Sequence, residues 1–308
     1  MNARLPLSRA ELAELHRVRP LRSLAAIAAE LGTIVASIWI AESCAWWPVT
    51  LAAIFVIGTR QHGLLVLMHE GVHQGLFRRR WLNDGLSRVL LAWPMLVSFS
   101  SYRDNHLAHH RHTNTERDPD WLRYADDPHM SFPMPRARLA WLLLSDLLGL
   151  RTLEQLRKLW TFGRAKPTTQ PGASGLAAAR LAYYLAIALL LSWAQAWPGL
   201  LVYWVVPLLS SLKFVLRVRL IAEHYGIPDE QGTRTVLGTP LDRLLIAPHG
   251  INFHAEHHRY AAVRFHQLAG FHRRLQRERP GWTPLCASYL DVLRECTQLA
   301  AGGHPGSS

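Results

Sequence analysis

Four long apolar segments dominate the hydropathy pattern of this chain. They cover residues 24–41, 47–68, 181–197 and 200–220. Each segment is about long enough to cross a hydrocarbon layer of roughly 30 Å as a helix. The segments come in two pairs, and each pair is joined by a short link that contains Trp but neither Lys nor Arg, residues 42–48 and 194–199. The pattern therefore predicts two transmembrane hairpins.

Basic residues are concentrated outside these two links. Five arginines precede the first apolar segment, and others lie in the central region and in the C-terminal third. Cytoplasmic loops of membrane proteins are enriched in Lys and Arg. We therefore expect both links to lie outside the cell, and both termini to lie in the cytoplasm.

The chain divides into three parts around these segments. Residues 1–23 are polar, and Ser8 and Glu11 have the spacing of a helix capping box. Residues 24–275 form the membrane domain, and residues 276–308 form a cytoplasmic segment with a disordered tail. The predicted fold class is all-α and integral membrane, with four transmembrane helices in two hairpins, interfacial helices and a cytoplasmic histidine-rich cap.

Shorter features fill the regions between the hairpins. The apolar stretches 86–99 and 139–150 are too short to span comfortably, which predicts helices that lie in the membrane interface or re-enter it. Residues 163–175 have the composition of a loop. Polar residues interrupt two of the spans, at positions 60–62 and at Lys213, Arg217 and Arg219. We expect them to reach the cytoplasmic interface rather than to form a polar wall beside a site.

Composition narrows the function classes. The chain is 49% hydrophobic, which excludes a disordered protein, and its formal net charge is +12. No nucleic-acid-binding motif accompanies that charge, so anionic lipid heads or an acidic redox protein explain it better. The three cysteines form no CxxC pair and no disulfide framework.

Nine of the 17 histidines fall into an ordered set of short motifs. The motifs are HEGVH (His69, His73), HLAHH (His106, His109, His110), AEHYG (His224) and HAEHH (His254, His257, His258). Residues three and four apart share a helix face, and neutral imidazole binds iron, zinc, copper and nickel. Nine ligands exceed the four of one tetrahedral zinc. The set therefore predicts two metal ions at a membrane-facing cytoplasmic site.

Ligand histidines usually donate their second N–H to a carboxylate or a carbonyl. The nearby candidates for this supporting role are Glu70, Asp104, Asp118, Asp120 and Glu256. Asp118-Pro119 favours a turn that folds a carboxylate back onto a histidine. Asn252 is expected to cap the helix of the last histidine motif. Outside the patterns stand His62, His112, His129 and His266, which we exclude from the ligand set.

The histidine motifs, in this order and with this hairpin topology, resemble the integral-membrane fatty-acid desaturase and hydroxylase superfamily. The resemblance is strongest to the bacterial fatty-acid desaturase branch that includes the rhizobitoxine-type desaturase. Four segments carry it: "QHGLLVLMHEGVH", "HLAHHRHTNTERDPD", "RLIAEHYGIP" and "NFHAEHH". The resemblance covers about residues 25–275. One departure is Leu220, which stands where acyl-CoA desaturases place an Asn that completes the metal shell through water. Glu223 is a candidate substitute.

This resemblance implies a di-iron centre that uses O2 as co-substrate to abstract hydrogen from an unactivated C–H bond. The substrate would be a lipid or acyl chain, and a ferredoxin-, rubredoxin- or cytochrome-type protein would supply electrons. We therefore expect a fatty-acyl desaturase of the bacterial inner membrane with a cytoplasmic active site. The metal ligands themselves are its only expected catalytic residues.

Two further reactions stay open, and two further classes of protein fit the motifs less well. A hydroxylase or ketolase of the same superfamily, acting on a lipid or carotenoid, would carry the same motifs. HEGVH also matches the HExxH of membrane zinc proteases, with Glu70 as general base, but that reading leaves both HxxHH motifs unexplained. A metal transporter would place its ligands near the bilayer midplane, whereas these histidines lie at the cytoplasmic ends of the spans.

Overall fold

The computed structural model describes residues 7–125, 127–152, 154, 173–224, 227 and 232–298. Regular structure in these ranges is almost entirely helical, which confirms the all-α prediction. The helical elements are α1 (Arg9–Leu15), α2 (Pro20–Cys44), α3 (Trp47–Val72), α4 (Arg80–Leu86), η1 (Ser87–Ala92), η2 (Trp93–Met95), α5 (Phe99–His112), α6 (Pro119–Tyr124), α7 (Arg136–Leu147), α9 (Ala173–Trp193), α10 (Trp197–Leu200), η3 (Leu201–Val205), α11 (Val206–Leu209), α12 (Ser211–His224), α13 (Pro240–Leu245), η4 (Pro248–Gly250), α14 (His254–Arg259), α15 (Leu268–Glu278) and α16 (Tyr289–Gln298). Four stretches are long and apolar enough to cross a membrane: Arg9–Cys44, Trp47–Val72, Gly175–Trp193 and Trp197–His224.

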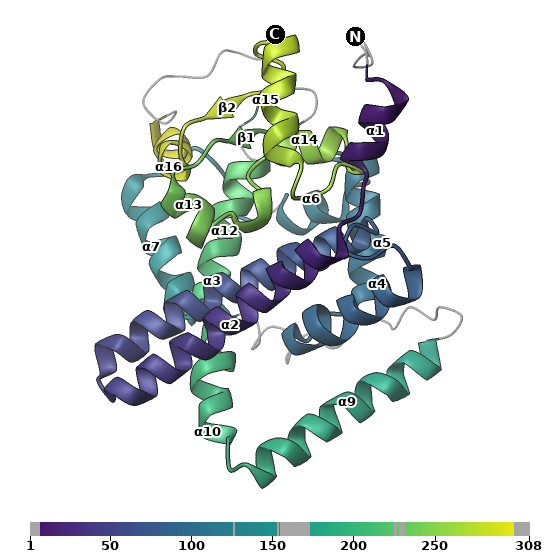
Figure 1. The fold of residues 1–308 in the computed structure, drawn as a ribbon. Coiled ribbons are helices and arrows are strands. Elements are labelled where there is room, and N and C mark those ends of the chain that lie inside the picture. The colour runs from purple at the N-terminus through teal and green to yellow at the C-terminus, as the bar shows by residue number, and fades with distance from the viewer. Residues whose placement is uncertain are drawn as a thin grey trace.

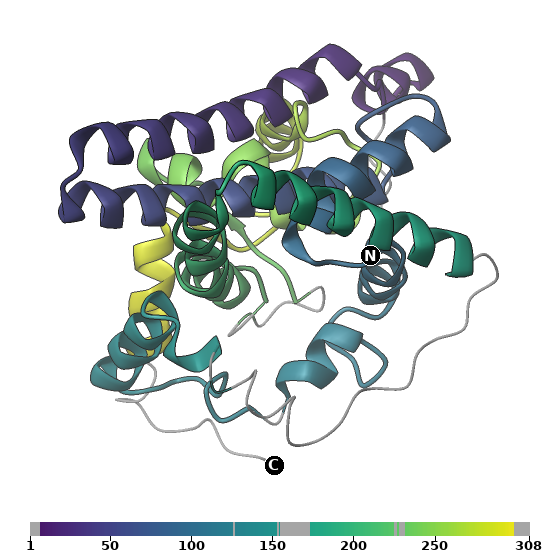
Figure 2. The ribbon, with the colours of Figure 1, turned by 90° about the horizontal axis from the view of Figure 1, so that it is seen from below.

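The first hairpin consists of α2 and α3, which lie side by side and antiparallel in both ribbon views (Figures 1 and 2). A proline stands at the start of each helix, where its fixed φ suits the first turn. Ala45 ends α2 in the left-handed conformation, with φ 45°. A Cβ on Gly63 would come within 2.4 Å of the Glu30 carboxylate. The absence of a side chain at this position therefore lets a buried acidic group of α2 lie against α3.

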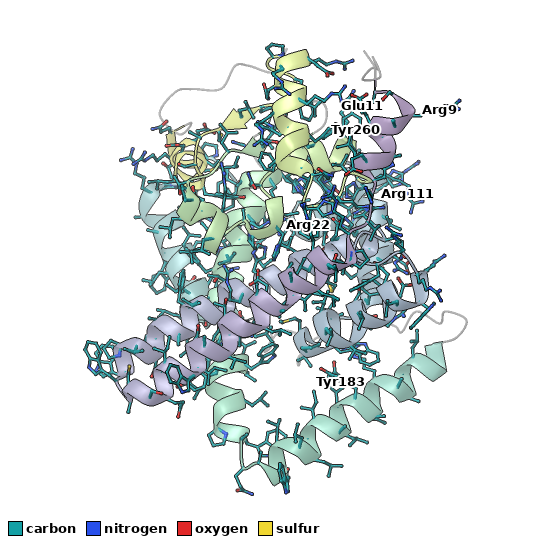
Figure 3. The ribbon with its side chains drawn as sticks, in the orientation of Figure 1. Arg9, Glu11, Arg22, Arg111, Tyr183 and Tyr260 are labelled. Carbon is teal, nitrogen blue, oxygen red and sulfur yellow. The ribbon has the colours of Figure 1, made fainter. Side chains whose placement is uncertain are left out.

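The second hairpin is less regular than the hydropathy pattern predicts. The third span ends at Trp193, four residues before the predicted limit, and a turn with Gln195 at φ 53° precedes α10. The fourth span contains a π-helical segment and a break at Ser210, whose φ and ψ are −125° and −91°. In Figure 1, α9 runs along the edge of the molecule farthest from α14 and α15, and Tyr183 marks it in Figure 3.

The structure confirms some of the shorter predicted features and contradicts others. Ser8 and Glu11 form the expected capping box at the start of α1. The stretch 86–99 is helical as far as Met95 and again at Phe99, where α5 begins, and α7 covers most of 139–150. The expectation that residues 60–62 reach solvent is wrong, because all three are buried inside the protein. The predicted loop 163–175 lies mostly outside the described residues, as does the predicted tail.

The histidine-rich end of the molecule is built from α5, α12, α14, α15 and α16 (Figure 1). Two short strands, β1 (Thr235–Val236) and β2 (Leu285–Cys286), pair in parallel there. Buried Val218 and Ile221 of α12 share a hydrophobic cluster with Tyr289 and Val292 of α16. This packing fixes the end of the fourth span against the C-terminal region, and so positions His224.

Candidate metal centre

The first histidine motif lies where α3 ends. His69 is in the last helical turn, and His73 is the C-cap residue. Asn83 holds the following turn, because its Nδ2 donates to the Gly71 carbonyl at 2.8 Å and its Oδ1 accepts the backbone N–H of Leu76 at 3.2 Å. This buried amide fixes the direction of the chain immediately after the two histidines.

The second motif lies on α5, which begins at the N-cap Ser98 and is anchored by Arg103. The Arg103 guanidinium donates two hydrogen bonds to the Asp84 carboxylate, at 2.9 and 2.5 Å. Burial alone would raise the pKa of Asp84, but the hydrogen bonds from Arg103, Gln74 and Asn83 outweigh it and lower the pKa to about 2. The pair therefore stays charged at neutral pH and ties α5 to α4.

The late histidine and the third motif approach from the other half of the chain. His224 is the last residue of α12, and the short helix α14 carries His254, His257 and His258. Glu256 on α14 is fully buried, accepts a hydrogen bond from the Thr235 hydroxyl at 2.5 Å, and also contacts His272 of α15. These contacts lock α14 between β1 and α15.

The folded chain brings all nine motif histidines into two adjacent clusters. In cluster A, one ring nitrogen of each member lies within 4.8 Å of those of the others: His69, His73, His106, His110 and His257. Cluster B joins two overlapping groups with the same limit, His109–His224–His258 and Glu223–His224–His254. Each HxxHH motif contributes to both clusters: its first and third histidines join one cluster, and its middle histidine joins the other.

Ring nitrogens face one another at separations that suit a shared metal ion. The Nε2 atoms of His73 and His106 are 2.9 Å apart, those of His110 and His257 are 3.1 Å apart, and those of His224 and His254 are 2.9 Å apart. Two nitrogens at about 2.1 Å from one metal lie about 3.0 Å apart at a right angle and about 3.4 Å apart at a tetrahedral angle. A cation between the two nitrogens of each pair could therefore contact both of them.

The protonation of the imidazoles also suits metal binding. Burial, and then repulsion from Arg264, lowers the pKa of His73 to about 4. Burial, and then repulsion from His73, lowers the pKa of His110 to about 3. Burial is also the largest cause that lowers the pKa of His257 and His258. At neutral pH these rings are uncharged, so their lone pairs are available to a cation.

Comparison with known proteins agrees with this arrangement. A family model described as fatty acid desaturase matches residues 45–287. The chain belongs to the fatty acid desaturase family. The match runs from the turn between α2 and α3 to β2, and so includes every residue of clusters A and B.

Individual relatives are distant. An sn-1 oleoyl-lipid 12-desaturase of Arthrospira platensis is 24% identical over 253 residues, which cover 75% of this chain and 69% of that protein. An sn-1 oleoyl-lipid 12-desaturase of Anabaena variabilis is 33% identical over 84 residues, 27% of this chain and 23% of the relative. An sn-1 acyl-lipid omega-3 desaturase (ferredoxin) of Nostoc sp. (strain 36) is 31% identical over 78 residues, 25% of this chain and 21% of the relative. The chain thus spans a quarter or less of the last two.

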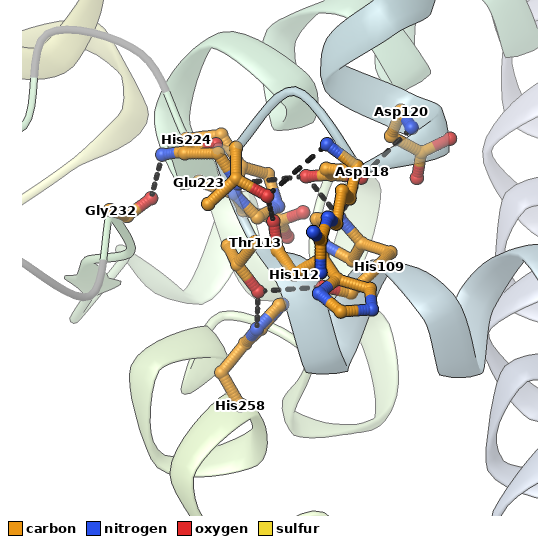
Figure 4. Close-up of polar contacts among 12 residues, drawn as sticks. His109, His112, Thr113, Asp118, Asp120, Glu223, His224, Gly232 and His258 are labelled. Carbon is orange, nitrogen blue, oxygen red and sulfur yellow. Dashed lines mark hydrogen bonds and ion pairs between the residues drawn. The ribbon is translucent and has the colours of Figure 1, made fainter.

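In this desaturase-family chain, the turn at Asp118-Pro119 folds the Asp118 carboxylate back onto a motif histidine. Its carboxylate is fully buried and accepts a hydrogen bond from Nδ1–H of His109, with both oxygens at 2.9 Å (Figure 4). The same carboxylate caps α6 and accepts the backbone N–H groups of Asn114 and Asp120. Because Nδ1 of His109 is the donor, its Nε2 lone pair faces cluster B.

In the described part of the chain, Glu70, Asp120 and Asn252 make contacts of a different kind. Glu70 is buried beside Gly75 and accepts the backbone N–H of Phe265. Asp120 contributes its backbone N–H to Asp118. The expectation that Asn252 caps α14 is wrong, because Phe253 is the N-cap and the Asn252 amide donates to the Val236 carbonyl at 2.9 Å. Among the described residues, none of the four excluded histidines joins a ligand group.

Two contacts beside cluster B involve residues that the motif spacing did not single out. Thr113 donates its hydroxyl hydrogen to the His109 carbonyl at 2.8 Å, so at 3.3 Å it accepts from Nδ1–H of His258 (Figure 4). Arg219 donates to both oxygens of Glu223 at 2.7 Å and to Nε2 of His62 at 2.8 Å. The i, i+4 spacing of Arg219 and Glu223 was a visible signal for the second contact.

Proposed function

We propose that this chain is an O2-dependent di-iron desaturase that introduces a C=C bond into fatty-acyl chains of membrane lipids. The observation that carries the proposal is the pair of buried clusters, A and B, at the ends of the second and fourth apolar helices. Nine imidazoles in two adjacent groups suit two iron ions, because neutral imidazole is a good ligand for iron.

Iron bound in clusters A and B would supply the O2 activation that an unactivated C–H bond requires. The surrounding residues orient and protect the ligands. Asp118 holds His109 and Thr113 holds His258, each through Nδ1, so that Nε2 is left for the metal. Burial of His106, His109, His254 and His257 excludes bulk water from the centre.

Desaturation removes two hydrogen atoms from the acyl chain while O2 is reduced to two waters, so two further electrons and two protons must enter. We propose an external redox protein as their source. The support is the net charge of +12, which favours an acidic partner, and the ferredoxin in the name of the Nostoc relative. Exposed Arg273 and Arg277 on α15, next to α14, form a suitable approach for it.

We also propose where the protein lies in the cell and in what form it takes its acyl substrate. The distribution of arginines supports a cytoplasmic site and cytoplasmic termini in a bacterial inner membrane. Arg9, Arg22 and Arg111 lie at the same end of the molecule as α14, whereas Tyr183 lies on α9 at the opposite end (Figure 3). The relatives named for oleoyl-lipid favour an acyl chain esterified to a membrane lipid.

The geometry weighs against a zinc protease built on HEGVH. A protease needs Glu70 beside the metal-bound water and an open coordination position. Instead, His69 and His73 share cluster A with three further imidazoles, and Glu70 belongs to no ligand group among the described residues.

The test is expression of the full chain in bacterial membranes with a ferredoxin, its reductase, NADPH and O2. Gas chromatography with mass spectrometry of the lipids should show a new double bond, and the purified protein should hold about two iron atoms per chain. His257→Ala should abolish the product, whereas His112→Ala, on α5 but outside both clusters, should retain it. A new hydroxyl or keto group would assign hydroxylase or ketolase chemistry, and about one zinc per chain would refute the di-iron proposal.

A further inference from the structure

Clusters A and B differ in the number of imidazoles that they contain. Cluster A has five, His69, His73, His106, His110 and His257. Cluster B has four, His109, His224, His254 and His258. Position 220, where the family resemblance predicts an amide, holds a leucine that packs in the hydrophobic cluster of α12 and α16. Cluster B therefore lacks one donor relative to cluster A.

A carboxylate lies at this point in cluster B. An oxygen of Glu223 lies within 4.8 Å of the ring nitrogens of His224 and His254, and its Oε2 is 3.8 Å from Nε2 of His254. Glu223 is 5% exposed, so its charge is held inside the protein. Each carboxylate oxygen has two lone-pair directions, so an oxygen that accepts a hydrogen bond can also bind a metal.

Arg219 supplies a counter-charge to Glu223 from one turn earlier on α12. Its Nε and Nη2 each donate to a different oxygen of Glu223 at 2.7 Å, and its Nη1 donates to Nε2 of buried His62 at 2.8 Å. A bidentate guanidinium–carboxylate pair has a defined geometry. It holds the carboxylate at the edge of cluster B whether or not a cation is present.

Charge balance favours the same role. Two divalent ions among nine neutral imidazoles would place four positive charges in a buried site, and unpaired buried charge is strongly unfavourable. Asp118, bound to His109, is one buried carboxylate beside cluster B, and Glu223 is another. Glu256 is instead occupied by Thr235 and His272.

We propose that Glu223 is a metal ligand of cluster B, and that its carboxylate is shared between the metal and the Arg219 guanidinium. This inference rests on the proposed di-iron function and adds a tenth protein ligand to it. The bound metal and the guanidinium are both attracted by the one negative charge of this carboxylate, so weakening one partner strengthens the hold of the other.

That competition separates a ligand from a structural ion pair. If Glu223 binds metal, Glu223→Gln should weaken metal binding at cluster B, whereas Arg219→Gln should strengthen it because the cation becomes the sole counter-charge of the carboxylate. If the pair is only structural, both variants lose the same contact and metal retention changes in the same direction. Asp146→Asn is the matched control. Asp146 of α7 pairs with Arg217, which lies on α12 as Arg219 does, and Asp146 belongs to neither cluster.

The experiment uses the full, iron-loaded chain in detergent. A chelator series followed by elemental analysis measures iron per chain, and thermal unfolding with and without the chelator measures how far iron stabilises the fold. Glu223→Gln should lose one of two iron atoms at about tenfold lower chelator concentration than the parent, with a smaller stabilisation by iron. Arg219→Gln should need more chelator and show a larger stabilisation, and Asp146→Asn should match the parent.

Parent-like retention of both iron atoms in Glu223→Gln would overturn the inference while leaving the di-iron proposal intact. A parent chain that binds no iron would instead overturn the proposed function. If Glu223→Gln does not fold, Arg219→Gln decides, because weaker iron retention in that variant contradicts the competition. Chains grown with Co²⁺ give a further readout, since a lost carboxylate ligand changes the visible absorption of the bound cobalt.

Discussion

Replacement of Asp118 by Asn should weaken the metal site through the tautomer of His109. Three N–H donors converge on the two oxygens of this carboxylate: Nδ1 of His109 at 2.9 Å and the backbone groups of Asn114 and Asp120 at 2.8 and 2.9 Å. An amide offers one oxygen and an NH2 group. The N–H groups of Asn114 and Asp120 bind different oxygens, so the amide oxygen can keep only one of them. If it keeps the Asp120 N–H that caps α6, the NH2 group faces Nδ1 of His109 and favours the tautomer in which Nδ1 is the acceptor.

The magnitude follows from that change of tautomer. With Nδ1 as acceptor, the proton of His109 moves to Nε2, which then has no lone pair for a metal in cluster B. Loss of such an outer partner typically weakens metal binding roughly 10- to 100-fold, equivalent to about 1.4–2.8 kcal/mol. The effect on folding should be smaller, because Asn is nearly as good an N-cap for α6 as Asp.

The assay is iron retention by the purified full chain against a chelator series, with thermal unfolding as the measure of folding. Glu116→Gln is the control, because it removes one negative charge from an exposed position in the same loop. Asp118→Asn should release iron at 10- to 100-fold lower chelator concentration, while Glu116→Gln should match the parent. Equal iron retention by Asp118→Asn and the parent would refute the role given to this carboxylate.

Two further changes test packing and partner binding. Gly63→Ala should destabilise the first hairpin by about 1–3 kcal/mol, because its Cβ would come within 2.4 Å of the buried Glu30 carboxylate. Gly32→Ala is the control, since nothing lies within 4 Å of the added Cβ. Thermal unfolding in detergent should show a loss of stability only for the change at position 63. Arg273→Glu combined with Arg277→Glu should raise the KM for an acidic ferredoxin about tenfold or more at low salt and leave iron content unchanged; an unchanged KM would exclude α15 as the docking surface.

The sequence predicts the metal-binding histidines better than it predicts the residues that hold them in place. The nine motif histidines are recognisable because helical spacing places each group on one side of a turn, and all nine meet in clusters A and B. Asp118 is also predictable, since only nine residues separate it from His109. These contacts depend on local geometry, which spacing along the chain determines.

Contacts between distant segments could not be predicted in the same way. Glu256 was expected beside a ligand, but its partners Thr235 and His272 come from β1 and α15. Asn252 was expected to cap α14, but the path of the chain through η4 turns its amide towards Val236. Hydropathy located the fourth span without its break at Ser210, because an average over many residues does not register a single backbone irregularity.

The close approach of α2 and α3 also bears on how the protein enters a membrane. Glu30 of α2 is 3.3 Å from Arg60 of α3 and 2.7 Å from His249, which is synthesised 219 residues after Glu30. A single charged side chain at the centre of a membrane helix opposes insertion by about 2.5–3.5 kcal/mol on translocon scales. Entry of α2 and α3 as a preformed pair would present a neutral Glu30–Arg60 couple to the lipid. The first hairpin would then be the unit of insertion, and His249 would join it only after the second hairpin had followed.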